Sequence, residues 1–268
     1  GLTALARLSS RVRRLKADRL YYLAPTPRTR SQVRRDRFFF QTLCGIQEAV
    51  GLAAAAPVPG RQPGEAARLL AVVGAPSDAA SLSLPVADAQ RLRVDGLWRE
   101  AKIGESRVIT LGPGGNTAAA RWPTERYEAL TRRLRAQAPD VRLVVLGSRQ
   151  DAETARRLPD AADWTGLTVL ESAEVLRRCA LFVGNNSGLM HLAAEVGTRC
   201  VAISSGRDHP GMWEPRGEGH IVLYKQVPCG GCRLSVCTDH GLTCLTSISV
   251  DEAALACAAA LSDALCRP

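Results

Sequence analysis

The sequence predicts an α/β protein built on a doubly wound, mostly parallel sheet, and three observations lead to that prediction. From about residue 105 onward, short apolar segments rich in branched residues alternate with longer segments of helical character. Glycine-containing loops follow the strands and precede the helices, where sheets of this type bind their ligands. The composition, 46% hydrophobic and 23% charged over 268 residues, is that of a globular chain with a substantial core.

The first hundred residues contain fewer elements. Four are expected there: helices at residues 2–16, 29–42 and 65–73, and a strand at residues 19–24 that Pro25 ends. The stretches 53–64 and 74–87 are rich in Ala, Pro, Gly and Ser, and we expect loops. The change of rhythm predicts a partial N-terminal domain over residues 1–100 and a second domain over residues 101–268.

The second domain repeats the order strand, loop, helix. Strands are expected at residues 107–111, 141–146, 180–184, 199–204 and 220–223, with a short one around Trp164. Helices are expected from Pro123 and at residues 150–158, 171–179, 187–196 and 250–265. Gly197 is expected to end the fourth of these helices.

The net charge is concentrated at the N-terminus. The whole chain carries 35 − 26 = +9, and residues 1–50 carry eleven Lys and Arg against three acids, or 11 − 3 = +8. Such a surface attracts phosphates on nucleic acid, anionic lipid or a phosphorylated sugar, although solvated helix faces explain most charge runs. Aromatic residues are sparse and no nucleic-acid motif accompanies the charge, so we expect no nucleic-acid partner.

Neither a membrane-spanning segment nor a signal peptide is expected. No run approaches the roughly 20 apolar residues that a spanning helix needs, and the N-terminus has no charged start followed by an apolar block. The nine cysteines are an odd number spread over a long chain, which favours reduced thiols and a cytoplasmic location.

The segment VGNNSGLMHLAAEVG, residues 183–197, predicts a strand that opens into a helix. Ser187 is expected to satisfy free amides of the first turn, and Gly188 to let a ligand approach the backbone. The positive helix end attracts a phosphate, and His191 lies one turn along the same face. Taken alone, the segment is better interpreted as a well-capped helix with a half-buried histidine.

A second loop, GPGGNTAAARWP at residues 112–123, contains three glycines between a strand and a helix. Such a loop suits close contact with a diphosphate, with Arg121 as the counter-charge. It matches neither a P-loop nor the dinucleotide-binding spacing, and a flexible turn with Trp122 packed on the core is the simpler interpretation of this loop alone.

The cysteine-rich segment near the C-terminus has two interpretations. Cys229, Cys232, Cys237 and Cys244 lie within sixteen residues, with His240 between the last two. Four soft ligands would suit a structural zinc ion, but the second half does not repeat the CxxC spacing. A thiol-rich loop packed under the C-terminal helix is the favoured interpretation, and zinc remains the alternative.

Together, the two glycine loops and their order resemble glycosyltransferase family 9, whose members add heptose to lipopolysaccharide. Residues 112–123 resemble its Pro-Gly-rich loop that leads to a basic residue and Trp-Pro. NNSGLMHLAA at 185–194 resembles its second motif, and SGRDHPGMWEP at 205–215 resembles the loop that follows. The likeness covers residues 105–268 well and 15–52 loosely, and the cysteine-rich tail shares it.

The resemblance implies a GT-B architecture, in which two Rossmann-like domains hold the acceptor (N-terminal) and the nucleotide-sugar donor (C-terminal). It implies an inverting transfer of heptose from ADP-L-glycero-D-manno-heptose to the lipopolysaccharide inner core, with no cofactor, on the inner face of the inner membrane. The donor-binding residues that it implies are Gly115, Asn116, Arg121, Asp151, Leu167, Asn186, Ser187, Gly188 and His191, with Thr168 as an alternative to Leu167 beside the adenine.

Three departures from the family pattern bear on function. Asn186 stands where the family usually has Asp, and Ala120 stands where it often has Lys or Arg. No counterpart of the first strand and its Gly-Asp loop, which carries the catalytic base, precedes Gly1, so we expect a truncated sequence or a divergent member with an incomplete N-terminal domain. A transferase with another donor and a catalytically impaired nucleotide- or glycan-binding module are therefore kept as alternatives.

Overall fold

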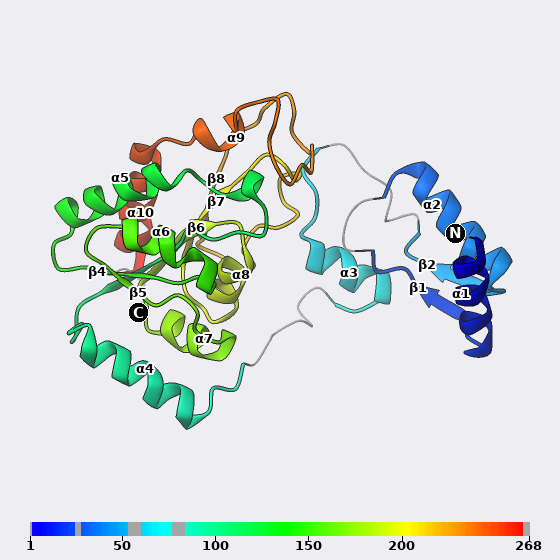
Figure 1. Cartoon of the computed structure of the whole chain (residues 1–268), viewed down its shortest axis with the longest axis horizontal. Helices are drawn as coiled ribbons and strands as arrows, with labels where there is room; N and C mark the ends of the chain where they lie inside the picture. Colours follow the sequence, from blue (N-terminus) through cyan, green and yellow to red (C-terminus); the bar gives the residue numbers. More distant parts are fainter. Residues whose placement is uncertain (1, 25–27, 53–59, 77–83, 265–268) are drawn as a thin grey trace. The chain divides into compact units, whose positions relative to one another are not determined.

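The structure is a computed structural model that describes residues 2–24, 28–52, 60–76 and 84–264. The chain forms two compact units, Gly1–Ser81 and Leu82–Pro268, and each is described by itself (Figure 1). The boundary lies before the position near residue 100 that the sequence suggested, because the helix at residues 88–100 packs on the second unit.

The C-terminal unit contains one sheet of six parallel strands in the order β5-β4-β3-β6-β7-β8. The strands are β3 (Val108–Gly112), β4 (Arg142–Val145), β5 (Ala161–Asp163), β6 (Leu181–Asn185), β7 (Cys200–Ser204) and β8 (Ile221–Tyr224). The order reverses between β3 and β6, so the loops after these two strands flank the topological switch point, where ligands of doubly wound sheets bind.

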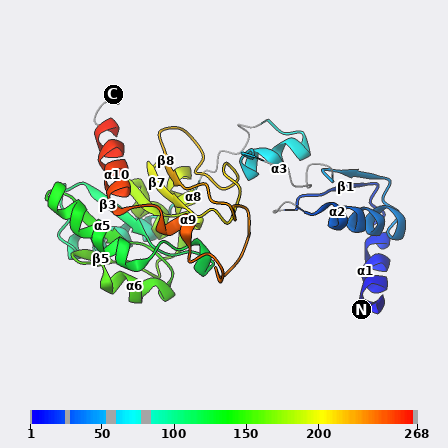
Figure 2. The ribbon, with the colours of Figure 1, turned by 90° about the horizontal axis from the view of Figure 1, so that it is seen from above.

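Helices cover both faces of this sheet. They are α4 (Asp88–Glu100), α5 (Thr124–Gln137), α6 (Ala152–Arg157), α7 (Val169–Arg177), α8 (Gly188–Glu195), α9 (Thr243–Thr246) and α10 (Val250–Ala264). Short 3-10 turns, Ala118–Ala120 and Arg149–Asp151, precede α5 and α6. Helices α5 and α10 pack against each other on one side (Figures 1 and 2), and α4 packs on α7.

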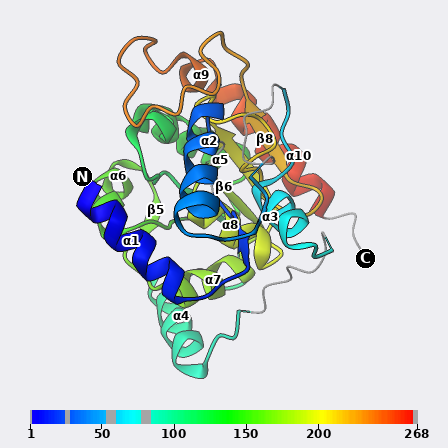
Figure 3. The same ribbon diagram turned by 90° about the vertical axis from the view of Figure 1, so that its right-hand side faces the viewer.

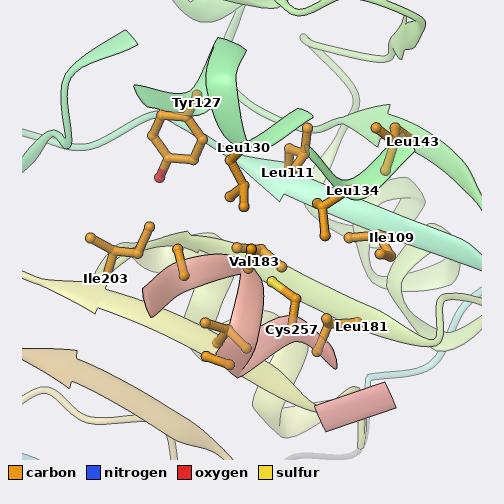
Figure 4. Packing of buried hydrophobic residues seen from close by; sticks show 14 of the residues in the cluster. Ile109, Leu111, Tyr127, Leu130, Leu134, Leu143, Leu181, Val183, Ile203 and Cys257 are labelled. Carbon is orange, nitrogen blue, oxygen red and sulfur yellow. The ribbon is translucent and has the colours of Figure 1, made fainter. Parts of the chain in front are cut away.

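Two buried clusters result, because alternate side chains of each strand point to opposite faces. One cluster joins Ile109, Leu111 and Val183 of the sheet to α5 and α10, and Figure 4 shows Leu130 and Cys257 converging on these strands. The other joins Val144, Phe182 and Cys200 to α4, α7 and α8. Both faces of the sheet are therefore covered by packed apolar side chains, as is usual for a parallel sheet.

The N-terminal unit contains two parallel strands, β1 (Arg19–Tyr21) and β2 (Glu48–Val50), and the helices α1 (Leu2–Arg14), α2 (Arg30–Arg37) and α3 (Glu65–Val73), which can be followed in Figure 3. Thr29 begins α2 with a reciprocal capping box to Gln32. The helix continues as a π-helical turn, Phe38–Leu43. A small cluster around Tyr22, Val33 and Leu52 forms its core.

Most elements expected from the sequence are present, and the structure adds three that were not expected: strand β2 and helices α4 and α9. The first and third are only three and four residues long. Helix α4 has few apolar residues and follows a stretch dominated by Ala, Ser and Pro, although Val94 and Leu97 are buried. Within the described residues, no helix combines the length and the apolar character that crossing a bilayer requires.

Candidate functional site

The two glycine loops singled out in the sequence lie side by side at the carboxyl ends of β3 and β6. These strands pair in register, with Gly112 opposite Gly184. The approach is close: a Cβ atom on Gly184 would lie 2.5 Å from the Gly112 carbonyl oxygen and 2.7 Å from the Phe182 ring. Glycine is required at this crossing because any side chain would push the two strands apart.

Asn185, the last residue of β6, fastens the two loops together. Its side chain is fully buried, and Nδ2 donates to the carbonyl oxygens of Pro113 (2.7 Å) and Gly114 (3.2 Å). Its Oδ1 accepts from the Trp122 amide (3.0 Å) and the Tyr127 hydroxyl (3.0 Å). The amide therefore uses both donors and both acceptor positions to fix the first loop against the start of α8.

The start of α8 faces open space. Gly188 is exposed, and a Cβ atom there would meet no described atom within 4 Å. The expectation that Ser187 caps the helix is wrong: Ser187 is the N-cap residue with an extended backbone, but its hydroxyl accepts no bond from the described first-turn amides. These amides and the positive helix end are therefore available to an anion.

Asn186 is half-buried. Its amide N–H donates to Ile203 O (3.0 Å) and its Nδ2 to Ser204 Oγ (3.4 Å). These bonds tie the residue to β7, so its side-chain oxygen is the group that a ligand hydroxyl could use. As a neutral amide it brings no negative charge to the phosphate-attracting end of α8.

Arg121 bends back over its own loop. Its Nε and Nη2 donate to the Gly115 carbonyl at 2.9 and 2.7 Å, and its Nη1 lies 3.6 Å from Asp151 Oδ1. Asp151 is buried, and its carboxylate accepts from the amide and the hydroxyl of Ser148. The Arg121 side chain is 40% exposed, its guanidinium is held beside the loop, and Asp151 compensates part of the charge.

An adjoining pocket has a volume of about 460 Å³, within the range of small-molecule sites. It brings together predicted residues from different elements: Leu167 before α7, and Gly188 and His191 on α8. Leu84, Val169, Leu189 and Leu192 make most of the remaining wall apolar. Thr168 instead caps α7 in a reciprocal box with Glu171, which leaves Leu167 as the better candidate for contact with a base.

His191 is one of the polar residues that line this pocket. Its ring packs edge-on against Trp213 with centroids 6.3 Å apart. Burial lowers the pKa of His191, and nearby Glu195 acts in the opposite direction. Because the pKa lies below its ordinary value of about 6.5, the imidazole is neutral at pH 7 and can both donate and accept a hydrogen bond.

The cysteine-rich segment lies against the glycine loop at residues 112–123 and the loop after β7. Cys229, Cys232, Cys237, Cys244 and His240 line one small cavity. The Ser235 carbonyl of this segment accepts from Ala119 N of the glycine loop (3.0 Å), and Gly231 N donates to Gly206 O in the loop after β7 (2.8 Å). In the part of the chain that the structure describes, no three His, Cys, Asp or Glu side chains are grouped to hold a metal ion. The bond between Ala119 and Ser235 connects this segment to the glycine loop.

The structure brings the predicted residues into two neighbouring groups. Leu167, Gly188 and His191 line the pocket, whereas Gly115, Arg121 and Asp151 form a contact group at the glycine loop. Asn116 is exposed on that loop. Sequence reasoning missed Asn185 as the residue that joins the loops. The available signal was a polar residue ending an otherwise apolar strand, which is common at sheet ends and seldom diagnostic.

An open helix start and a glycine loop at the switch point of a doubly wound sheet form the kind of anion-binding site that is typical of nucleotide-binding α/β proteins. Comparison with known families gives the particular class. Residues 67–243 match glycosyltransferase family 9 (heptosyltransferase), and the chain belongs to this family.

A curated relative is the lipooligosaccharide heptosyltransferase 2 of Haemophilus influenzae, 33% identical over 114 residues. The match covers 38% of this chain and spans about a third, 32%, of the length of that protein.

Two solved structures share the fold. The E. coli ADP-heptose lps heptosyltransferase II has a TM-score of 0.60 and 19% identity, covering 98% of this chain and 82% of that chain. A family 9 glycosyltransferase from Veillonella parvula has a TM-score of 0.69 and 17% identity, covering 84% and 65%. The expected α/β fold of the GT-B type is confirmed.

Proposed function

We propose that this protein is an inverting glycosyltransferase that moves heptose from ADP-L-glycero-D-manno-heptose to the lipopolysaccharide inner core. Membership of family 9 supports the reaction class. The observation that carries the proposal is the pairing of an open α8 start with a glycine loop, fixed by Asn185 beside a pocket of suitable size.

In this proposal the donor lies across both groups of residues. The diphosphate contacts the first-turn amides of α8 at Ser187 and Gly188, and the loop at Gly115 and Asn116. The adenine packs against Leu167, and the ribose lies near the loop that Asp151 holds. Asn186 and the neutral His191 bind sugar hydroxyls.

The proposed reaction depends on stabilising the negative charge that develops on the ADP leaving group. An acceptor hydroxyl attacks the anomeric carbon from the face opposite the diphosphate, and the bond from that carbon to the diphosphate oxygen breaks. The acceptor proton passes to a carboxylate base. Negative charge that develops on the leaving ADP is stabilised by fixed amides and by Arg121, and this stabilisation needs no metal ion or other cofactor.

The N-terminal unit is the proposed acceptor side. Helix α1 carries a surface that fits the phosphates of an inner-core sugar and the anionic face of the inner membrane. That surface contains the exposed residues Leu5 and Leu8 and the basic residues Arg7, Arg11 and Arg14, and exposed Leu15 directly follows the helix. We place the protein in the cytoplasm, in peripheral contact with that membrane, and propose no nucleic-acid partner.

Calorimetric titration of the full chain tests the donor assignment. We expect saturable binding of ADP and of ADP-heptose, and weaker binding of UDP and GDP. Absence of saturable ADP binding would overturn the assignment, and preference for another nucleotide would identify a transferase with a different donor.

One observation favours a second candidate, a nucleotide- or glycan-binding module without turnover. Asn186 places a neutral amide where the family resemblance predicts a carboxylate. Formation of heptosylated lipid A–core acceptor by the protein, followed by mass spectrometry, separates the two: binding without product would favour the module.

A further inference from the structure

One wall of the pocket comes from outside the loops of the sheet. Leu84 is half-buried and lines the pocket. It belongs to segment 84–87, just after the boundary between the two compact units and just before α4. The remaining apolar wall is built from residues before and within α7 and from α8.

Three constraints hold this segment in place. The Arg177 guanidinium of α7 donates from Nη2 to the Leu84 carbonyl oxygen at 2.7 Å. Val86 is buried, so the segment is anchored two residues further on. Pro85 restricts Leu84 to extended backbone conformations. The Leu84 side chain therefore occupies a fixed position at the pocket although it lies outside any helix or strand.

The chemistry of the pocket identifies what Leu84 would touch. Leu84, Leu167 and Leu192 are apolar surfaces, whereas the polar residues Ser148, His191 and Glu195 lie along the same lining. A planar nucleobase needs apolar contact on its faces and polar groups at its edge, whereas a diphosphate needs amides and cations. The apolar wall therefore suits the base, and the open start of α8 suits the phosphates.

We propose that Leu84 contacts the base of the bound nucleotide and that Arg177 is a positioning residue, acting through its bond to the Leu84 carbonyl. This inference rests on the proposed function, and it adds a determinant of base binding in the segment near the start of the C-terminal unit, before α4. Truncating Leu84 removes apolar contact with the base and leaves the phosphate contacts intact.

The experiment compares two probes, ADP and inorganic pyrophosphate, by calorimetry on the full chain. For Leu84→Ala we expect the Kd for ADP to rise about tenfold and the Kd for pyrophosphate to stay within about twofold. For Arg177→Met we expect a rise of about threefold to tenfold for ADP alone. The double variant should bind ADP no more weakly than Leu84→Ala, because Arg177 acts through Leu84.

Matched controls separate this role from general damage. Leu255→Ala removes a leucine that is 69% exposed on α10, and Arg133→Met removes an exposed arginine paired with Asp251. Both should keep the wild-type Kd for ADP. Arg177→Lys retains a donor for the Leu84 carbonyl and should recover most of the affinity. Leu84→Met keeps an apolar side chain and should bind ADP within about twofold of wild type.

Each outcome has a distinct meaning. Unchanged ADP affinity in Leu84→Ala, or an equal loss for ADP and pyrophosphate, would overturn the inference. If Leu84→Ala fails to fold, the exposed variants Arg177→Met and Arg177→Lys provide the test. Their Kd values for ADP and for pyrophosphate then show whether the Leu84 segment contacts the base. Failure of the wild-type chain to bind ADP would instead overturn the proposed function.

Discussion

At the scale of single residues, Asn185 determines whether the site exists. Its four hydrogen bonds connect strand β6, the glycine loop and the start of α5 in a fully buried position. The Tyr127 hydroxyl depends on the same group, and burial raises the pKa of Tyr127, so the phenol stays protonated and donates. No other amino acid supplies two donors and two acceptor positions in a side chain of this size.

Replacing Asn185 by Ala should therefore lower both stability and donor affinity. The change leaves the Trp122 amide and the Tyr127 hydroxyl without their acceptor, and we expect the free energy of unfolding to fall by about 3 kcal/mol. Urea denaturation measures this loss. The exposed Asn116→Ala is the matched control: it should change stability by less than about 0.5 kcal/mol and weaken ADP binding only. Equal stability of the two variants would contradict the role of Asn185.

His220 gives a pH dependence whose sign follows from its contacts. Its Nδ1 accepts from the Cys200 amide (3.1 Å), so the proton lies on Nε2, which donates to Arg216 O (2.7 Å). Burial lowers the pKa of His220, the Arg216 carbonyl opposes this shift, and Arg199 adds to it. Protonation of Nδ1 would break the bond to Cys200.

Stability should therefore fall on acidification. The unfolded histidine binds its proton near pH 6.5, whereas the folded one binds it at lower pH. Between these values the free energy of unfolding should drop by at most about 1.4 kcal/mol per pH unit. The measurement is the difference between wild type and His220→Gln in urea titrations from pH 7.5 to 5. Parallel curves for the two proteins would refute this assignment.

At the scale of elements, helix α8 is the part whose start is open to a ligand. The absence of a Cβ atom at Gly188 leaves room in front of the first-turn amides, and no described atom fills that room. A substitution there should separate stability from binding, because alanine favours the helix while its methyl group enters the ligand space.

For Gly188→Ala we expect unchanged or slightly higher stability, by up to about 1 kcal/mol, and at least about a tenfold weaker affinity for ADP. Gly96→Ala in α4 is the matched control, since a Cβ atom there also meets no described atom within 4 Å. This control should raise the free energy of unfolding by about 0.5–1 kcal/mol and leave the Kd for ADP unchanged. Thermal melts and calorimetry measure both, and wild-type ADP affinity in Gly188→Ala would remove α8 from the donor site.

The sequence predicted elements better than contacts. Branched apolar runs such as residues 141–146 and 180–184 identified β4 and β6 because a buried parallel strand needs such residues. Helix α4 was missed because its apolar face is only two buried residues wide. The Ser187 cap was wrong because residue type shows that a hydroxyl can bond, and not which way its rotamer points. Leu84 gave no local signal, since its place depends on Arg177, far along the chain.

At the scale of the whole molecule, stability resides in two separate cores. The C-terminal unit contains both large clusters and the complete pocket, whereas the N-terminal unit depends on a small cluster around Tyr22 and Leu52. Each unit has its own sheet and its own buried side chains, so each should unfold in its own transition.

We therefore expect two transitions in a calorimetric scan of the full chain. ADP at 100 times its Kd should stabilise only the C-terminal unit, by about 2.7 kcal/mol. Gly184→Ala should lower the midpoint temperature of the transition that ADP raises, because its Cβ atom would collide with Gly112 O.

Leu52→Ala should lower the free energy of unfolding of the N-terminal unit alone, by about 2–5 kcal/mol. A single transition shifted by both substitutions would show that the units unfold together.

The pairing of β3 with β6 also affects how the chain is made. Asn185 lies 72 positions after its partner Pro113 in the chain. A ribosome that adds roughly 5–20 residues per second therefore leaves the β6-facing edge of β3 unpaired for several seconds. During that interval the nascent chain exposes the edge of an apolar strand, which is where chaperones and mistaken partners bind. Nucleotide cannot protect the polypeptide at this stage, because its binding site does not exist until β6 has been synthesised.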